Sequence, residues 1–320
     1  MEAPPKVSVI TPLYNSSAFI RATLDSLRAQ TCADWESILV DDGSTDDTAE
    51  AVGPYLEDAR FRLIRQENRG IAGARNTAIR EARGEWVCLL DHDDRWLPRK
   101  LEKQLAFALE HSCDVVCTDA FIVTEGKSWV YSGGFPEVAA EVQRAASDPG
   151  VDVFAQLIKF DFLCASSVML RRSLFEERGL LDPSAVPADD YEMWLRCMPE
   201  AKFGFLGEPL IEWVMHEGNY SHNERLMTEQ TIRVLQRHRR RLALDARRRR
   251  QFDESLAQQF HSLYEKLAAT HSRADALRGL LPLLKDGPGP LRLLYLAAWP
   301  RLVARARHSA RYRLGLLHKA

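Results

Sequence analysis

The N-terminal third of the chain alternates between short apolar runs and segments with helical periodicity, and this alternation restricts the fold more than any other feature. The apolar runs predict strands at residues 7–11, 38–40, 61–64, 86–90 and 115–117. Apolar residues at helical spacing predict helices between them, at residues 18–29, 45–56, 72–82 and 98–111. Because strands that alternate with helices usually pair in parallel, we predict an α/β fold with a Rossmann-like, mostly parallel sheet and helices on both faces.

Polar residues stand directly after three of the predicted strands. They form the segments 12–15 (Pro-Leu-Tyr-Asn), 41–44 (Asp-Asp-Gly-Ser) and 91–94 (Asp-His-Asp-Asp). In an open parallel sheet, ligands bind beyond the carboxyl ends of the strands. We therefore expect these three segments to converge at one edge of the sheet and to form a binding site there.

The pattern of the chain changes near residue 222. Strand patterns stop there, and Leu, Ala and Arg dominate the rest of the sequence. We therefore predict an α/β domain over residues 1–222 and an all-helical, arginine-rich C-terminal appendage over residues 223–320.

The composition is that of a folded protein of the reducing cytoplasm. The formal net charge of -2 argues against a nucleic-acid-binding field over the whole molecule. The 6 cysteines have no CxxC spacing, which disfavours a zinc site and suits a reducing compartment. The N-terminal residues lack the features of a signal peptide, and no apolar run approaches the roughly 20 residues that span a bilayer.

Asp91 and Asp93 form an Asp-x-Asp pair at the end of a predicted strand. Alternation along an extended backbone places both carboxylates on the same side, and oxygen ligands of this kind suit Mg²⁺ or Mn²⁺. The same residues are compatible with a solvated acidic turn, or with an N-cap of the helix that follows.

Asp42 and Arg75 are candidates for contacts with a nucleotide. Asp42 precedes Gly43, which permits the positive φ of a tight turn, and its carboxylate is suited to accept a hydrogen bond from a base. A turn capped by Ser44 or Thr45 is the alternative, although capping does not explain two adjacent acids. Arg75 could pair with phosphate or base oxygens, or be an ordinary surface arginine.

Asp189 and Asp190 are predicted to begin a helix, where the helix dipole favours acidic residues. The simplest interpretation is that both acids stabilise the end of the helix. The functional interpretation is that Asp190 acts as a general base. His216 follows the last predicted strand of the α/β domain. It is interpreted either as a ligand or as an ordinary surface or core histidine.

Together, these segments resemble the inverting glycosyltransferases of family two, which have the GT-A fold. The resemblance covers residues 5–222 and rests on five motifs in the same order and spacing. The motifs are Pro12-x-Tyr14-Asn15, Val40–Asp46, Asn68–Asn76, Asp91-x-Asp93-Asp94 and Asp189–Arg196, with His216 after them.

The resemblance implies an enzyme that moves a sugar from a nucleotide diphosphate sugar, with UDP favoured, onto an acceptor hydroxyl with inversion at the anomeric carbon. It also implies Mn²⁺ or Mg²⁺ as cofactor, a saccharide or lipid-linked acceptor, and a place in bacterial cell-surface glycan synthesis. A non-catalytic nucleotide-sugar-binding protein is disfavoured, because binding alone needs no base. A nucleotidyltransferase usually has a glycine-rich basic loop after the first strand, and residues 11–15 are not such a loop.

Roles for individual residues follow from the resemblance alone. Asp42 would contact the nucleobase, and Asp190 would deprotonate the acceptor hydroxyl. Asp93 would be the main metal ligand, with Asp91 beside the ribose or the metal and His216 on the metal–diphosphate side. The remaining contacts to the nucleobase would come from Pro12, Tyr14 and Arg75.

The sequence departs from the family pattern at two places. The acid pair begins with Asp189, where relatives often have Glu. Trp213 and Val214 precede Met215-His216, where many relatives have Tyr-Arg-x-His. The missing arginine puts part of the phosphate contact, and therefore the role of His216, in question.

The C-terminal appendage carries arginine runs at residues 237–250 and again at residues 301–313. Leu, Tyr and Trp mixed with arginine in the tail fit a helix at the surface of an anionic membrane, and a docked tail with solvated arginines is the alternative. The first interpretation places the protein at the inner face of the cell membrane. Nucleic-acid binding is not expected, because aromatic residues are not interleaved with the basic runs.

Overall fold

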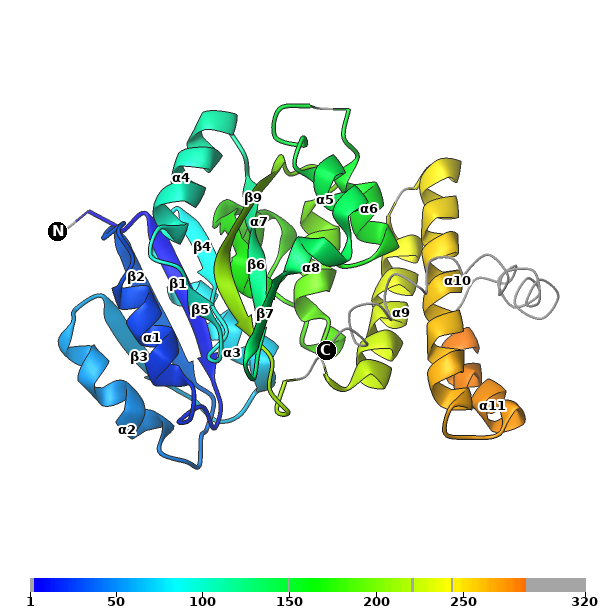
Figure 1. Ribbon diagram of the computed structural model, residues 1–320, viewed down its shortest axis with the longest axis horizontal. Helices are drawn as coiled ribbons and strands as arrows, with labels where there is room; N and C mark the ends of the chain where they lie inside the picture. The colour runs from blue at the N-terminus through cyan, green and yellow to red at the C-terminus, as the bar shows by residue number, and fades with distance from the viewer. Residues whose placement is uncertain (1–2, 149, 220–221, 243, 286–320) are drawn as a thin grey trace. The chain divides into compact units, whose positions relative to one another are not determined.

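The computed structural model describes residues 3–148, 150–219, 222–242 and 244–285 (Figure 1). Two compact units make up the chain. The first contains Met1–Val153 and Phe162–His216, and the second contains Phe154–Asp161 and Glu217–Ala320.

The first four strands of the sheet are parallel, in the order β3-β2-β1-β4 (Figure 1). β1, β2 and β4 are buried along their whole length, as expected for strands that helices cover on both faces. Their apolar runs therefore predicted them correctly. The bounds are Val7–Leu13 (β1), Trp35–Asp41 (β2), Phe61–Arg65 (β3) and Trp86–Leu89 (β4).

The rest of the sheet is mixed. β8 runs antiparallel to both of its neighbours, β4 and β6, whereas β6 and β9 are parallel. The short strands β5 and β7 pair antiparallel with β9 and β6, which makes nine strands among the residues that the structure describes. The remaining bounds are Arg95–Trp96 (β5), Val115–Thr124 (β6), Lys127–Val130 (β7), Val168–Arg171 (β8) and Phe203–Val214 (β9).

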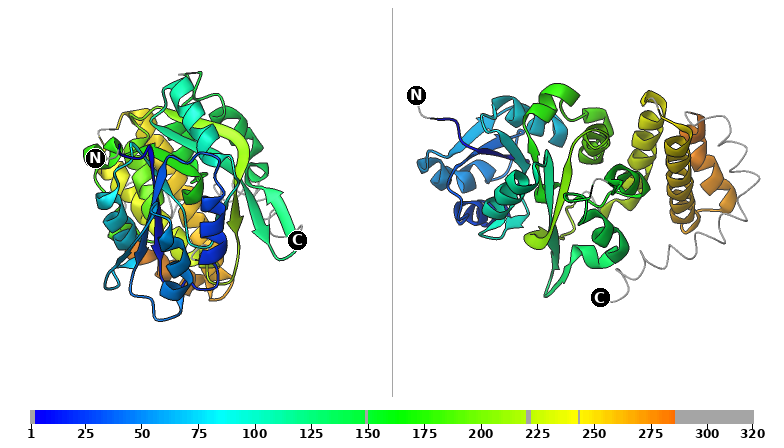
Figure 2. Two further views of the ribbon diagram at one scale, coloured as in Figure 1. Left: turned by 90° about the vertical axis from the view of Figure 1, so that its left-hand side faces the viewer. Right: turned by 90° about the horizontal axis from the view of Figure 1, so that it is seen from above.

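Helices cover both faces of this sheet (Figure 2), so the predicted α/β class is confirmed. On one face, Val9, Leu39 and Cys88 join side chains of α1 and α4 in a single core. Their neighbours Ile10 and Ile38 are buried on the opposite face, where α3 packs on β1 and β2. The helices of this unit are α1 Ile20–Arg28, α2 Thr48–Val52, α3 Gly70–Glu81, α4 Lys100–His111, α5 Pro136–Val142, α7 Ser173–Arg178 and α8 Asp189–Cys197.

The antiparallel strands were not part of the prediction, because periodicity reports which residues are buried and not the direction of a strand. One predicted helix is also shorter than expected. The segment 45–56 forms α2 followed by a 3-10 turn, η1 (Gly53–Glu57). Pro54 lacks an amide hydrogen and cannot continue the α-helical bonding.

The second unit is helical in its described residues, as the sequence predicts for the C-terminal region. α9 (Glu224–Arg241) and α10 (Ala246–Ala268) lie side by side, and α11 (Arg273–Lys285) packs against both (Figure 1). α6 (Val153–Lys159) contributes Phe154, whose ring meets that of Phe252 edge-on at 6.2 Å. None of the described helices is at once long and apolar enough to cross a lipid bilayer.

Candidate active site

Three loops leave the sheet at one edge, beyond the carboxyl ends of β1, β2 and β4. Leu13 pairs with Asp41, and the amide of Asp42 donates to the carbonyl of Leu13 at 2.9 Å. Likewise, the amide of Leu90 donates to the carbonyl of Ile10 at 2.9 Å. The polar segments after these strands therefore share one edge, as the sequence predicts.

Asn15 connects the first two of these loops. Its side-chain oxygen accepts a hydrogen bond from the amide of Thr45 at 2.9 Å, and its own amide donates to the hydroxyl of Ser44 at 3.0 Å. Ser44 and Thr45 thus bind the neighbouring loop and do not cap α2, so the capped-turn alternative is wrong for these hydroxyls. Pro12 is buried within β1, whereas Tyr14 at the loop is 50% exposed.

The carboxylate of Asp42 is buried and fixes the start of α3. Its Oδ1 accepts from the side-chain amide of Gln66 at 2.6 Å and from the backbone amide of Arg69 at 2.9 Å. Gly43 has a φ of 81°, the positive value that its position after Asp42 suggests. These hydrogen bonds hold Asp42 at the carboxyl edge of the sheet, facing the turn that leads into α3.

Arg75 lies at the centre of the site and is 3% exposed. Its Nη1 donates to Oδ2 of Asp189 at 3.0 Å and its Nη2 donates to Oδ1 of Asp91 at 2.6 Å. Burial opposes the charge, but the two carboxylates outweigh burial and raise the pKa of Arg75 above its ordinary value. The guanidinium binds two carboxylates of its own chain, whereas the sequence suggested phosphate or base oxygens as its partners.

Asn76, the next residue of α3, fixes the chain that leads into α8. Its side-chain amide donates to the carbonyl of Leu181 at 2.9 Å, and its side-chain oxygen accepts from the amide of Leu181 at 3.0 Å. Next to this contact, Arg196 from the last turn of α8 donates to the carbonyl of Leu180 at 2.7 Å. Arg75 therefore holds the first turn of α8, and Asn76 holds the chain that leads into it.

Asp190 is partly exposed in the first turn of α8, next to the buried Asp189. Its Oδ1 accepts the amide of Tyr191 at 2.7 Å. Burial and the negative charge of Asp189 raise the pKa of Asp190 to about 7, against the opposing effect of Arg75. A carboxyl group with this pKa can accept a proton near neutral pH, which is the property of a general base.

Asp93 and His216 face each other on the same edge. Oδ2 of Asp93 lies 2.9 Å from Nε2 of His216, and the imidazole stacks on the ring of Phe19, with 4.2 Å between centroids and 20° between planes. Both side chains are mostly buried, at 11% and 21% exposure. The segment after β9 and the loop after β4 thus meet through a carboxylate–imidazole pair.

Ser166 and Asp94 fix the Asp-x-Asp loop, although the sequence analysis assigned a role to neither. The hydroxyl of Ser166 accepts from the amide of Asp91 at 3.1 Å and donates to Oδ2 of Asp94 at 2.5 Å. Oδ1 of Asp94 also accepts the amide of Val214 at 3.1 Å. Burial, with the charges of Asp93 and Asp91, raises the pKa of Asp94 well above its ordinary value. The only sequence feature that pointed to Asp94 is its position next to the Asp-x-Asp pair. No feature of the sequence near Ser166 pointed to that residue.

Asp93 and His216 are suited to bind a divalent cation whose remaining ligands would be phosphate oxygens of the substrate. Among the described residues, no group of three or more His, Cys, Asp or Glu side chains could hold a metal ion. Ions such as Mg²⁺ commonly take one or two carboxylates and fill the other positions with phosphate oxygens and water. Asp93 and His216 offer one carboxylate oxygen and one imidazole nitrogen at one place.

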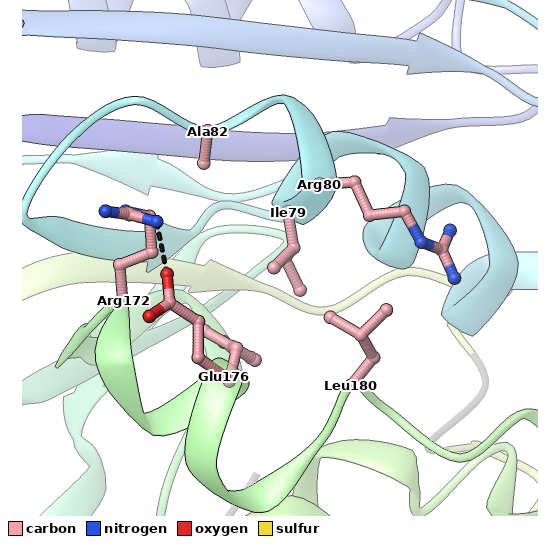
Figure 3. Close-up of a pocket in the computed structure, with 7 residues that line it drawn as sticks. Ile79, Arg80, Ala82, Arg172, Glu176 and Leu180 are labelled. Atoms are coloured by element: carbon pink, nitrogen blue, oxygen red, sulfur yellow. Dashed lines mark hydrogen bonds and ion pairs between the residues drawn. The ribbon is translucent and has the colours of Figure 1, made fainter.

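A cavity of about 230 Å³ lies at the far end of α3, beside α7 (Figure 3). Ile79 and Leu180 are among the apolar residues that line it, and Arg172, which also lines it, is paired with Glu176. None of the predicted site residues lines it. The arrangement at the carboxyl edge is therefore separate from this cavity.

The chain is similar in sequence and in fold to known glycosyltransferases. The profile described as "Glycosyl transferase family 2" matches residues 8–179. TuaG of Bacillus subtilis (strain 168), named for teichuronic acid biosynthesis, is 34% identical over 224 residues, which are 69% of this chain and 83% of TuaG. WfgD of Escherichia coli is 32% identical over 198 residues, 61% of this chain and 70% of its own, and is named a UDP-Glc:alpha-D-GlcNAc-diphosphoundecaprenol beta-1,3-glucosyltransferase.

Two solved structures show the same fold. S. aureus TarS 1–349 in complex with UDP-GlcNAc aligns with a TM-score of 0.69 at 21% identity, over 90% of this chain and 83% of that one. The mannosyltransferase PcManGT from Pyrobaculum calidifontis, in complex with GDP-Man and Mn²⁺, aligns with a TM-score of 0.59 at 21% identity, over 98% and 88% of the two chains. The likeness to these glycosyltransferases confirms the predicted GT-A fold.

Proposed function

This chain belongs to glycosyl transferase family 2, and we propose that it transfers a sugar from a UDP-sugar to an acceptor hydroxyl with inversion at the anomeric carbon. The observation that carries the proposal is the bridge through Arg75. One buried guanidinium holds Asp91 of the Asp-x-Asp loop and Asp189, the neighbour of Asp190. The proposed base and the proposed diphosphate side thus belong to one connected network.

Asp190 is the general base of this proposal. It takes the proton of the acceptor hydroxyl while that oxygen forms a bond to the anomeric carbon. The bond from the anomeric carbon to the diphosphate oxygen breaks on the opposite face, so the configuration inverts and no sugar–enzyme bond is needed. The pKa of about 7 at Asp190 supports this role, because a base works best with a pKa near the working pH.

The nucleotide lies, in this proposal, over the loops after β1 and β2. Asp42 contacts the base and the exposed ring of Tyr14 covers it, with Pro12 shaping the loop. UDP is favoured because TarS was solved with UDP-GlcNAc and WfgD is named for UDP-Glc. Arg75 acts through Asp91 and Asp189 and does not contact the nucleotide in this assignment.

Asp93 and His216 hold Mn²⁺ or Mg²⁺ in this proposal, with Asp91 beside the ribose. The cation, when bound, stabilises the negative charge that develops on the diphosphate as it leaves. Asp94 and Ser166 keep the loop in place for this task. The Mn²⁺ in the PcManGT structure supports the assignment.

The acceptor we propose is a lipid-linked saccharide of bacterial cell-surface glycan synthesis. The names of TuaG and WfgD support this class, since one refers to teichuronic acid and the other to a diphosphoundecaprenol acceptor. An enzyme with such an acceptor would work at the cytoplasmic face of the membrane. The membrane contact predicted for the tail falls on residues 286–320, outside the described residues, and stays a prediction.

The test is a screen of nucleotide sugars with Mn²⁺ by thermal shift, followed by a transfer assay with the sugars that raise the melting temperature. Asp190→Asn is the matched variant. We expect it to bind the donor as the wild type does, and to lose transfer by about 10²- to 10⁴-fold, the usual contribution of a general base. Transfer at the wild-type rate in this variant would remove Asp190 from the role, and no shift with any nucleotide sugar would remove the donor assignment.

A further inference from the structure

Gln66 connects the proposed nucleobase contact to α3, and it has no part in the proposed transfer reaction. It follows β3 at the carboxyl edge of the sheet, where its backbone amide donates to the carbonyl of Asp41 at 3.0 Å. Its side chain forms a hydrogen bond at each end. Nε2 donates to Oδ1 of Asp42 at 2.6 Å, and Oε1 accepts from the hydroxyl of Thr77 at 2.7 Å. Gln66 is therefore held at three points beside Asp42.

Thr77 and Asp42 together fix the orientation of the Gln66 amide group. A threonine inside a helix commonly bonds a carbonyl of the preceding turn, whereas the hydroxyl of Thr77, within α3, donates to Oε1 of Gln66. The amide group has one acceptor end and one donor end, so its NH₂ end is directed at the carboxylate. A chain of hydrogen bonds thus runs from α3 to the loop after β2.

The two oxygens of the Asp42 carboxylate have different surroundings. Oδ1 accepts from Gln66 and from the backbone amide of Arg69, whereas no described residue donates to Oδ2. Asp42 is only 2% exposed, and a buried acceptor is normally hydrogen-bonded. Oδ2 is therefore the oxygen that is left for a donor group of a ligand.

The direction in which this oxygen points determines which pyrimidine base fits. Uracil has an N–H group at N3, which can donate to a carboxylate. Cytosine has an unprotonated acceptor at N3, and its donor is the N4 amino group at the next ring position. A carboxylate held in one place beside N3 therefore binds uracil and repels cytosine, whereas a carboxylate that is free to turn can accept from the amino group of cytosine.

We propose that Gln66, oriented by Thr77, is a positioning residue that makes the nucleotide site select uracil over cytosine. The inference rests on the proposed function, in which Asp42 contacts the nucleobase. Gln66 acts by fixing the carboxylate of Asp42. A site that is built to bond one group of a ligand rejects an analogue without that group, because a buried polar group of the site is then left unpaired.

The test is calorimetric titration of the full-length protein with UDP and with CDP, both with Mn²⁺. The diphosphate is common to both ligands, so the ratio of the two dissociation constants reports the base. We expect the wild type to prefer UDP, and this preference to fall by about 10-fold in Gln66→Ala, the order of one hydrogen bond to a charged group. Thr77→Val, which keeps Gln66 and removes only the hydroxyl that orients it, should show a smaller fall. Asp42→Asn should lose the preference, because its amide can donate to N3 of cytosine.

Gln30→Ala is the matched control. Gln30 also bridges two segments, since its Nε2 donates to the carbonyl of Leu97 at 2.8 Å and its Oε1 accepts from the amide of Leu101 at 3.1 Å. Neither partner belongs to the loops after β1 and β2. We expect this variant to keep the wild-type preference for UDP, and melting temperatures verify that each variant is folded.

Equal weakening of UDP and CDP binding in Gln66→Ala would overturn the inference, because a merely structural glutamine gives that result. If Asp42→Asn loses the preference while Gln66→Ala and Thr77→Val both keep it, the inference fails and the base contact of Asp42 stands. If Asp42→Asn keeps the preference, or if the wild type binds both nucleotides alike, the base contact in the proposed function fails together with the inference.

Discussion

Arg75 and Asp189 form a buried ion pair, with Nη1 and Oδ2 3.0 Å apart, although 114 positions separate them in the sequence. The other arm of the same guanidinium holds Asp91 at 2.6 Å. α3 is thereby fixed both to the first turn of α8 and to the loop after β4. The charge of Asp190, the neighbour of Asp189, depends on this junction, because Arg75 and Asp189 shift its pKa in opposite directions.

Removal of Arg75 should be costly for stability. We expect Arg75→Ala to lower the free energy of unfolding by about 3–5 kcal/mol, because the loss of one partner leaves buried carboxylates uncompensated. Urea denaturation measures the change. Arg80→Ala is the control, since Arg80 is exposed on the same helix, and we expect an effect below about 0.5 kcal/mol there. Similar losses in the two variants would contradict the central place of Arg75.

The pH dependence of transfer should report Asp190. Its pKa is raised to about 7 by burial and by Asp189. Only the carboxylate accepts a proton, so kcat/KM should increase as pH rises through about 7 and level off above it. In Asp189→Asn a negative neighbour is lost, the pKa of Asp190 falls, and the rising limb moves to lower pH. Release of UDP measured across this range gives both profiles. A limb that stays in place in Asp189→Asn would show that another group controls the rate.

The pair of Asp93 and His216 should control the metal-dependent part of donor binding. We expect Asp93→Ala and His216→Ala each to weaken binding of Mn²⁺ and of UDP with Mn²⁺, and to leave metal-free UDP binding near that of the wild type. Calorimetric titration with and without Mn²⁺ separates the two quantities. Asp47→Ala, at an exposed acid of the loop after β2, is the control and should match the wild type. Equal losses with and without the cation would remove both residues from the ligand set.

The local part of this structure was predictable, and the long-range part was not. Burial on both faces makes β1, β2 and β4 nearly continuous apolar runs, so the strands themselves and the common edge of their loops could be predicted from the sequence. Asp91, Asp93 and Asp190 were singled out by motifs that lie within a few residues. The partners of Arg75 and the direction of β8 depend on pairing between distant segments. Neither helical periodicity nor residue type reports such pairing, and Ser166 was missed for the same reason.

Ser166 provides the sharpest test of that missed network. Its hydroxyl is fully buried and is shared by the amide of Asp91 and the carboxyl of Asp94. Ser166→Ala should lower the free energy of unfolding by about 1–3 kcal/mol, the cost of buried polar groups without partners. It should also weaken binding of the UDP-sugar, because the Asp-x-Asp loop loses its support.

Ser167→Ala is the matched control for this change. Ser167 is the next residue, is equally buried, and donates to the carbonyl of Cys164 at 2.7 Å, with no link to the loop after β4. We expect a comparable loss of stability in urea, and an unchanged dissociation constant for the UDP-sugar. If the Ser166 hydroxyl positions Asp91, both variants lose stability but only Ser166→Ala loses affinity for the UDP-sugar. If that hydroxyl is merely structural, the two variants will behave alike in both measurements.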